Sequence, residues 1–297
     1  GDLLDENDET VVLTIGAPTN AGVGATSVHT LTINDDDAPP TVEFTAAMQS
    51  VGEGAGTATI TAQLSAASGL PVTVPYGVAG DATDPDDYTL APNPIVIPAG
   101  MTSADVTVTL VGDLLDENDE TVVLTIGAPS NAGVGATNVH TLTISDDDAP
   151  PTVEFTAAMQ SVGEGAGTAT ITAQLSAASG LSVTVPYGVA GDATNPDDYT
   201  LAPNPIVIPA GMTTADVTVT LVGDLLDEND ETIVLTIGGP TNAGVGATNV
   251  HTLTVTDDDA PPTVDFVFSM VSTPEDSGTV DICLLYTSDA ADDETSV

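Results

Sequence analysis

Apolar and polar residues alternate over short stretches of this chain, and clusters of Gly, Pro, Asn and Asp separate the stretches. Between residues 56 and 65, Ala58, Ile60, Ala62 and Leu64 would share one face of an extended strand. A period of two residues predicts a half-buried β-strand. Similar short apolar stretches predict further strands at residues 41–44, 72–78, 95–97, 106–110, 122–126 and 142–144.

These stretches predict an all-β fold. Seven short strands fall within 111 residues, turn residues join them, and no amphipathic helix interrupts them. This pattern is typical of an immunoglobulin-like β-sandwich. His140 alternates with Leu142 and Ile144, so we expect it at the core or its rim. Met48 is expected to fill a gap in the core.

The chain is an array of repeats. The segment DLLDENDET begins at residues 2, 113 and 224, and residues 38–148 differ from residues 149–259 at 8 of 111 positions. Tandem copies of domain size predict independently folding units joined in series. We therefore expect tandem immunoglobulin-like β-sandwiches, and near-identical copies favour a spacer or an adhesin over an enzyme.

The domain boundaries follow from the segment DDDAPP, whose two prolines form a short stiff hinge. Residues 283–297 leave the repeat pattern and resemble translated sequencing-adapter sequence, so we treat them as a non-native tail. The expected divisions are 1–38 (the end of one domain), 39–149 and 150–260 (two complete domains), 261–282 (the start of a further domain) and 283–297 (the tail).

The charge excludes several functions. The chain has 45 Asp and Glu residues, no Lys or Arg, and a formal net charge of −45. Without basic side chains it cannot neutralise nucleic-acid phosphates or anionic lipid headgroups. No apolar run approaches the roughly 20 residues of a membrane span, so we expect no direct membrane insertion. No G-x-S-x-G, H-E-x-x-H or Cys/His pair is present, and we expect no enzyme activity.

The acidic residues concentrate in loops. In the first complete repeat they lie in VGEGAG, GDATDPDDY, DLLDENDE and the closing DDD. Strand polarity allows these segments to share one end of a sandwich. Two charges 4 Å apart repel by roughly 4 kcal/mol at an effective dielectric constant of 20, so the cluster needs protons, water or cations. Many hard oxygen ligands suit Ca²⁺. The alternative is a set of solvated acidic loops on a salt-adapted surface.

The order of these motifs resembles the Calx-beta repeat. VGEGAG is followed by PYGVAGDAT and DDY, then by IVIPAGM, ADVTVTLVGD, DENDETVVL and TLTISDDD, and the resemblance covers essentially each whole repeat. It implies an immunoglobulin-like sandwich that binds several Ca²⁺ ions at one tip. Gly112 and Gly223 depart from the pattern, because the best-known calcium-binding members carry a further Asp there. We therefore expect about two or more ions per complete repeat.

The resemblance also implies the ligands. In the first complete repeat they are Glu53, Asp87, Asp113, the Leu115 carbonyl, Glu117, Glu120, Asp146, Asp147 and Asp148. In the second they are Glu164, Asp198, Asp224, Leu226, Glu228, Glu231, Asp257, Asp258 and Asp259. In the first partial domain they are Asp2, Glu6, Glu9, Asp35, Asp36 and Asp37. Asp86, Asp116 and Asp119 are expected to be rim charges.

We therefore expect a segment of a secreted or cell-surface protein of the bacterial adhesin type. Its partners would be calcium ions and the neighbouring repeats, with Ca²⁺ stiffening a stalk or adhesion arm. Three alternatives remain open: an acidic spacer without specific metal sites, a Ca²⁺-sensing region of a membrane transporter, and a module that recognises a specific adhesion partner.

Overall fold

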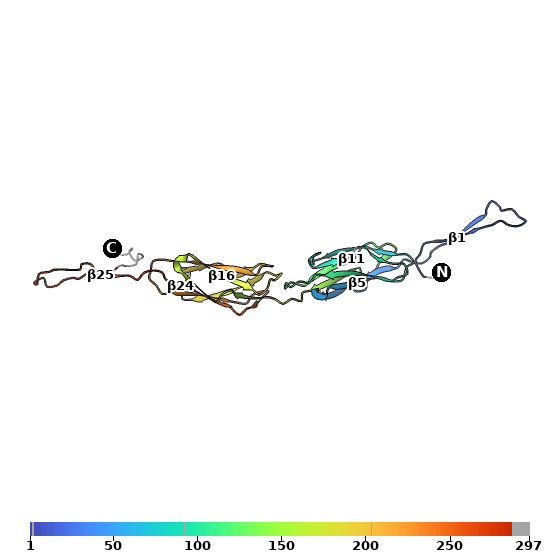
Figure 1. The fold of residues 1–297 in the computed structure, drawn as a ribbon. Helices are drawn as coiled ribbons and strands as arrows, with labels where there is room; N and C mark the ends of the chain where they lie inside the picture. The colour runs from blue at the N-terminus through green and yellow to red at the C-terminus, as the bar shows by residue number, and fades with distance from the viewer. Residues whose placement is uncertain (2, 92, 203, 287–297) are drawn as a thin grey trace. The chain divides into compact units, whose positions relative to one another are not determined.

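The computed structural model describes residues 1, 3–91, 93–202 and 204–286 (Figure 1). The chain divides into two compact units, Gly1–Asp148 and Ala149–Val297. In the described residues, no helix is long and apolar enough to cross a membrane.

Two sheets form the body of the first unit. The five-stranded sheet has the order β12 (Gly133–Val134), β3 (Thr41–Phe44), β5 (Thr57–Leu64), β10 (Ser103–Leu110) and β8 (Tyr88–Leu90). The four-stranded sheet has the order β4 (Met48–Gly52), β13 (Val139–Ser145), β11 (Glu120–Ile126) and β7 (Tyr76–Gly80). A separate pair joins β6 (Val72–Val74) to β9 (Ile95–Ile97). The predicted all-β fold is confirmed.

The core lies where the two sheets face each other. Val42 and Ile60 come from one sheet and Leu124 and Leu142 from the other, and all four are at most 1% exposed. The alternation of apolar residues therefore marks the inward faces, as expected for a sandwich. His140 is also buried, and its ring packs edge-on against a phenylalanine of β3.

The structure has strands that the sequence pattern does not predict. β4, β8 and β12 are short and lack a clear apolar alternation. The predicted strand at residues 72–78 divides at Pro75: β6 pairs with β9, whereas β7 pairs with β11. Proline lacks a backbone donor, which suits a point where the chain changes sheets. The core position expected for Met48 is wrong, because its side chain is 79% exposed on β4.

The second unit repeats this arrangement. Its five-stranded sheet has the order β19 (Tyr199–Leu201), β21 (Thr214–Leu221), β16 (Thr168–Leu175), β14 (Thr152–Phe155) and β23 (Gly244–Val245). Its four-stranded sheet has the order β15 (Met159–Gly163), β24 (Val250–Thr256), β22 (Glu231–Ile237) and β18 (Tyr187–Gly191), and β17 (Val183–Val185) pairs with β20 (Ile206–Ile208).

Two strand pairs lie outside these sandwiches. β1 (Glu9–Thr14) pairs with β2 (Val28–Ile33), and β25 (Val264–Phe266) pairs with β26 (Leu284–Tyr286). β26 belongs to the tail that we excluded from the fold prediction, and residues 287–297 of that tail lie outside the described part of the chain.

Candidate metal centre

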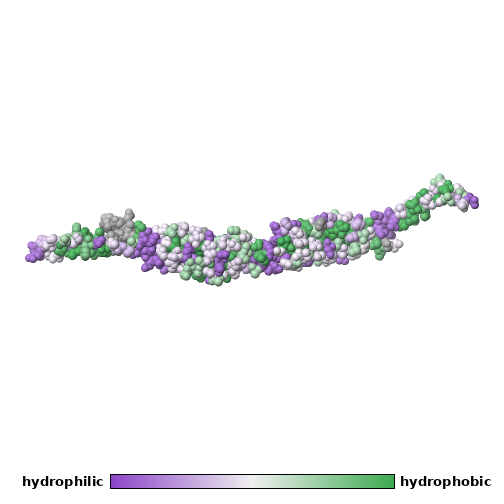
Figure 2. Space-filling model, viewed as in Figure 1, coloured by the Kyte–Doolittle hydropathy of each residue, from purple (hydrophilic) through white to green (hydrophobic). Residues whose placement is uncertain are grey.

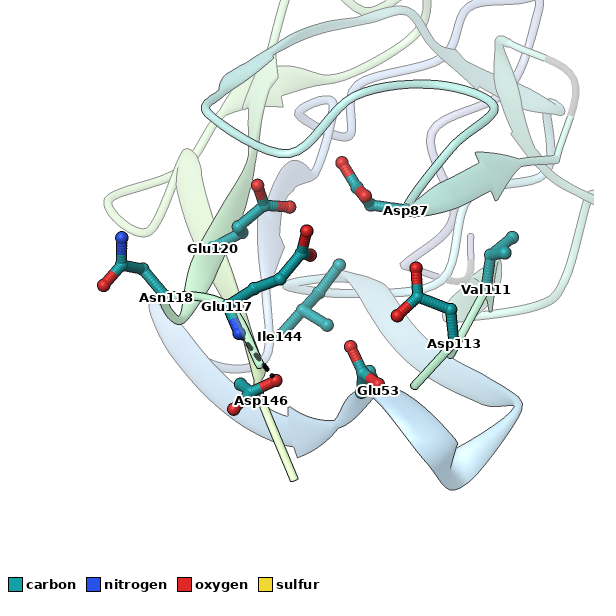
Figure 3. Close-up of a pocket in the computed structure, with 9 residues that line it drawn as sticks. All are labelled: Glu53, Asp87, Val111, Asp113, Glu117, Asn118, Glu120, Ile144 and Asp146. Carbon is teal, nitrogen blue, oxygen red and sulfur yellow. Dashed lines mark hydrogen bonds between the residues drawn. The ribbon is translucent and has the colours of Figure 1, made fainter. Parts of the chain in front are cut away.

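Acidic side chains from four segments meet at one end of the first sandwich (Figure 3). Glu53 lies on the 3-10 turn η1 (Glu53–Ala55), and Asp87 directly precedes β8. Asp113 and Glu117 belong to the segment between β10 and β11, and Asp146 follows β13. Together with Glu120 they line one pocket, whose full lining is Glu53, Asp87, Val111, Asp113, Glu117, Asn118, Glu120, Ile144 and Asp146.

Hydrogen bonds hold these loops in place. The Thr83 amide and hydroxyl donate to Asp87 Oδ2 over 2.6 and 2.9 Å. The Leu115 amide donates to Asp113 Oδ1 over 2.7 Å. Each carboxylate that accepts such bonds is fixed in orientation, which suits a ligand for a cation.

A second set of bonds joins the loop before β11 to the end of β13. The Glu117 amide donates to Asp146 Oδ1 over 3.2 Å, and the Asp146 amide donates to Asp119 Oδ1 over 3.2 Å. Asp119 is exposed, as expected for a rim charge, but it also positions a residue of the pocket.

A further acidic cluster lies beside this pocket and shares Glu53 with it. Glu53, Asp147 and Asp148 each offer an oxygen within 4.8 Å of the others. A Cβ atom at Gly54 would come within 3.1 Å of Asp147 Oδ2. A side chain at this position would therefore require the Asp147 carboxylate to shift by a few tenths of an ångström.

Burial and mutual repulsion perturb the acidic groups of this pocket. Burial raises the pKa of Glu53, and the charges of Asp113, Asp146 and Asp148 raise it further, against a lowering hydrogen bond from the Asp113 backbone. Burial, together with neighbouring acidic residues, also raises the pKa of Glu117.

Glu120 is the most perturbed of these groups. Its pKa rises to about 7, first because of burial and then because of its hydrogen bond to Asp87 and the charge of that residue. A carboxyl group with this pKa carries a proton at mildly acidic pH, and that proton relieves part of the repulsion.

The second unit carries an equivalent centre. The pKa of Glu231 rises to about 7 for the same reasons, whereas hydrogen bonds from the Thr194 backbone and side chain lower the pKa of Asp198. The pocket is lined by Glu164, Asp198, Val222, Asp224, Glu228, Asn229, Glu231, Val255 and Asp257, and the adjoining cluster is Glu164, Asp258 and Asp259. In Figure 2, hydrophilic residues gather at the end of this unit next to β25.

The donor set fits a hard cation. Asp148 Oδ2, Glu164 Oε1 and Asp257 Oδ1 are buried and accept no hydrogen bond. The chain has no Lys or Arg to pair with them. Buried carboxylate oxygens need a partner, and carboxylates in this number suit Ca²⁺. Mg²⁺ would retain more water, and Zn²⁺ would prefer His or Cys ligands.

The remaining predicted ligands divide into two groups. Asp2 lies outside the described residues. Glu6, Glu9, Asp35, Asp36 and Asp37 line a separate pocket near β1 and β2. The predicted roles of the Leu115 and Leu226 carbonyls stay predictions, because the contacts that fix these residues involve their amides.

Two features of the site differ from the sequence analysis. Asp86 is exposed, as expected for a rim charge, and so is Asp227, the counterpart of Asp116, whereas Asp116 itself is only 7% exposed. Asn118 and Asn229 line the pockets but were not among the predicted ligands. The sequence could have predicted these two residues as ligands, since an Asn between acidic residues offers a side-chain amide oxygen of the kind that binds Ca²⁺.

Comparison with protein families decides the identity of the repeats. The model of the Calx-beta domain matches residues 35–148 and again residues 146–259. The chain belongs to the Calx-beta family. The search of curated proteins found no match.

Solved structures of Calx-beta domains are similar to this chain at low identity. CBD12 from CALX1.2 is 17% identical, covers 72% of this chain and 99% of its own, and has a TM-score of 0.36. The calcium binding domain CBD12 of CALX1.1 is 20% identical, covers 69% of this chain and 82% of its own, and also has a TM-score of 0.36. The apo-form Calx CBD1 domain is 18% identical, covers 37% of this chain and 100% of its own, and has a TM-score of 0.35.

Proposed function

We propose that each complete Calx-beta repeat binds Ca²⁺ at its acidic end, and that bound Ca²⁺ stiffens a stalk or adhesion arm of a secreted or cell-surface protein. The observation that carries this proposal is the convergence of six carboxylates in one pocket of a chain without Lys or Arg. Carboxylates this close repel one another unless cations, protons or solvent offset their charge, and a bound cation offsets several of them at once.

The arrangement supports about two ions per repeat. One ion would be held by the pocket residues Asp87, Asp113, Glu117 and Glu120. The other would be held by Asp147 and Asp148, and Glu53 belongs to both clusters. The ions would neutralise the acidic loops next to the prolines that join one repeat to the next, which is where stiffness matters for a tandem array.

Calorimetric titration and thermal unfolding of the whole chain test this proposal. Extracellular modules typically bind Ca²⁺ with dissociation constants of about 10⁻⁴–10⁻³ M, and one ion at 100 times its dissociation constant stabilises a fold by about 2.7 kcal/mol. We expect chelation at constant ionic strength to lower the melting temperature and to widen the distribution of end-to-end distances in X-ray scattering.

Matched variants separate specific binding from general screening. Changing Asp146, Asp147 and Asp148 to Asn should abolish most of the calcium-dependent stabilisation in the first complete repeat. Changing Asp105 to Asn should not, because Asp105 accepts a hydrogen bond from Thr61 on the outer face of the β5–β10 pair. An acidic spacer without sites would instead be stabilised equally by sodium chloride and by calcium chloride at matched ionic strength.

A further inference from the structure

A buried histidine occupies the same place in both complete repeats. His140 of β13 and His251 of β24 are each 2% exposed. Nδ1 of His140 lies 2.7 Å from the Ala46 carbonyl oxygen, and Nδ1 of His251 lies 2.7 Å from the Ala157 carbonyl oxygen. A carbonyl oxygen can only accept a hydrogen bond, so Nδ1 carries the proton in each ring. The neutral ring then has a bare lone pair on its other nitrogen, Nε2.

Both Nε2 atoms are buried and have no hydrogen-bond partner in the part of the chain that the structure describes. The His140 ring packs edge-on against Phe44, with 5.8 Å between the ring centroids, and His251 packs in the same way against Phe155. Protonation of Nε2 would add a second donor and a positive charge at this apolar place. A lone pair without a donor costs less than a buried charge without a counter-charge.

The strands around His140 do not supply a counter-charge. These strands are β3, β4, β11 and β13, and their only acidic residues are Glu43 and Glu120. Glu43 lies on the outer face of β3, where its Oε2 accepts a hydrogen bond from the Ala136 amide over 3.1 Å. Glu120 belongs to the acidic pocket and pairs with Ile144, four residues from His140 and therefore about 13 Å along the strand.

The other titratable residues on the strands of this sandwich do not supply one either. Asp105 on β10 accepts a hydrogen bond from Thr61 on the outer face of the β5–β10 pair. Tyr76 and Tyr88 are buried, and burial raises the pKa of both hydroxyls, so both stay neutral. A charged ring at His140 would therefore be unpaired in the folded sandwich. The second unit has the same residue types at each of these positions.

The histidine fastens an edge strand. β4 is the last strand of the four-stranded sheet, where it pairs with β13. The Ala46 carbonyl that accepts the bond from Nδ1 belongs to the segment between β3 and β4. The next carbonyl, of Ala47, accepts the Thr141 amide over 2.9 Å. A ring that leaves the core to take up a proton would therefore give up its bond to the segment that leads into β4.

We propose that His140 and His251 are acid-sensitive latches. While neutral, each ring fastens the segment before an edge strand, β4 or β15, to its sandwich, and protonation of the ring releases that edge. The latch goes beyond the proposed calcium function, because it needs no metal ion and lies at the end of β13 or β24 away from the acidic pocket.

The sign and size of the effect follow from linkage. An exposed histidine takes up a proton near pH 6.5, so the open state is favoured as the pH falls below about 6.5. If only the open ring is protonated, the opening constant of the segment rises about tenfold between pH 7.5 and pH 5.5.

Hydrogen exchange of the whole chain, with chelator and at constant ionic strength, measures this opening. Residues 45–52 and 156–163 have the same sequence, so one peptide reports both repeats and the two histidines are changed together. Asn can still offer an amide donor to the carbonyl but cannot take a charge. After correction for intrinsic exchange, we expect the rate ratio between pH 5.5 and pH 7.5 to be about ten times larger in the parent than in His140→Asn/His251→Asn. Titration of the carboxylates affects both chains alike and cancels in this comparison.

His29 provides the matched control. It occupies the same repeat position but is exposed on β2, so His29→Asn should keep the parent's rate ratio. Circular dichroism shows whether the double variant is folded. Imidazole ¹⁵N spectra of the parent test the latch without any variant. We expect His140 and His251 to show a protonated Nδ1 and a bare Nε2, and to stay neutral at a pH at which His29 is charged.

Three results would each overturn the proposal. The first is a parent rate ratio that the double variant keeps. The second is the opposite tautomer in the two buried rings. The third is charging of all three rings together while the chain stays folded. Calcium binding is absent from each of these measurements, so their failure leaves the proposed calcium function standing.

Discussion

Calcium binding should release protons at mildly acidic pH, and Glu120 should be the main source. Its pKa of about 7 compares with an ordinary value of 4.5. At pH 6 a group with this pKa is about 90% protonated, and at pH 8 it is about 10% protonated. Because the ion needs the ionised carboxylate, we expect about one proton released per complete repeat at pH 6 and close to none at pH 8.

The same shift fixes the sign of the pH dependence. A carboxyl group whose pKa is raised in the folded state is more favourable when protonated. The calcium-free protein should therefore lose stability as the pH rises from about 4.5 to about 7. The shift corresponds to at most about 3 kcal/mol per site, and solvent around these partly exposed loops reduces this figure. Calcium affinity should rise about tenfold between pH 6 and pH 8 from this one proton.

Calorimetric titration in buffers of different ionisation enthalpy measures the protons directly. Changing both Glu120 and Glu231 to Gln should remove most of the release, and the Asp105→Asn control should keep it. The pKa values of Glu53 and Glu117 are raised in the same direction, so any release that survives in the double variant is assigned to them. The reasoning fails if calcium binds at pH 6 with an enthalpy that is the same in every buffer.

Three further changes probe the fold and the site. His140→Ala should lower the free energy of unfolding by about 2–4 kcal/mol in urea denaturation. The change leaves a buried cavity and removes the 2.7 Å hydrogen bond between Nδ1 and the Ala46 carbonyl. A loss below about 1 kcal/mol would contradict the structural role of this ring. Gly80→Ala should lower the free energy of unfolding by more than about 3 kcal/mol, because Gly80 has a φ of 124° and a Cβ atom would lie 2.0 Å from the Thr121 carbonyl oxygen. An unchanged melting temperature would refute this. Glu53→Gln should weaken the binding of both ions of its repeat in calcium titrations, since Glu53 belongs to both clusters. If only one of the two binding steps is weakened, the clusters are independent.

The sequence predicts the core strands because burial on one face imposes a period of two. Ile60, Leu124 and Leu142 show this pattern and are buried as expected. β4 could not be predicted in this way. It pairs in parallel with β13 and leaves Met48 exposed, so no burial pattern marks it. Its position depends on strand pairing between distant segments, which local composition does not encode.

Charge predicts the acidic end of the sandwich, but not the role of each acidic residue there. Asp116 and Asp119 lie three residues apart in the same motif, and one is buried while the other is exposed. In the first copy of the motif, backbone pairing buries Asp5 against Ser68 whatever its side chain prefers. Burial imposed through the backbone leaves no signal in the side-chain pattern.

Gly112 connects the sequence of this chain to the geometry of its site. At this position the resemblance to the Calx-beta repeat implies a further Asp, and this chain has Gly instead. A Cβ atom at Gly112 would lie 3.2 Å from the backbone carbonyl carbon and oxygen of Glu53, and 3.3 Å from Gly54 Cα. These contacts are with backbone atoms, so a side chain at position 112 requires η1 to move by a few tenths of an ångström. Because η1 holds Glu53, the one carboxylate that both clusters share, a side chain at position 112 would shift a residue that belongs to both.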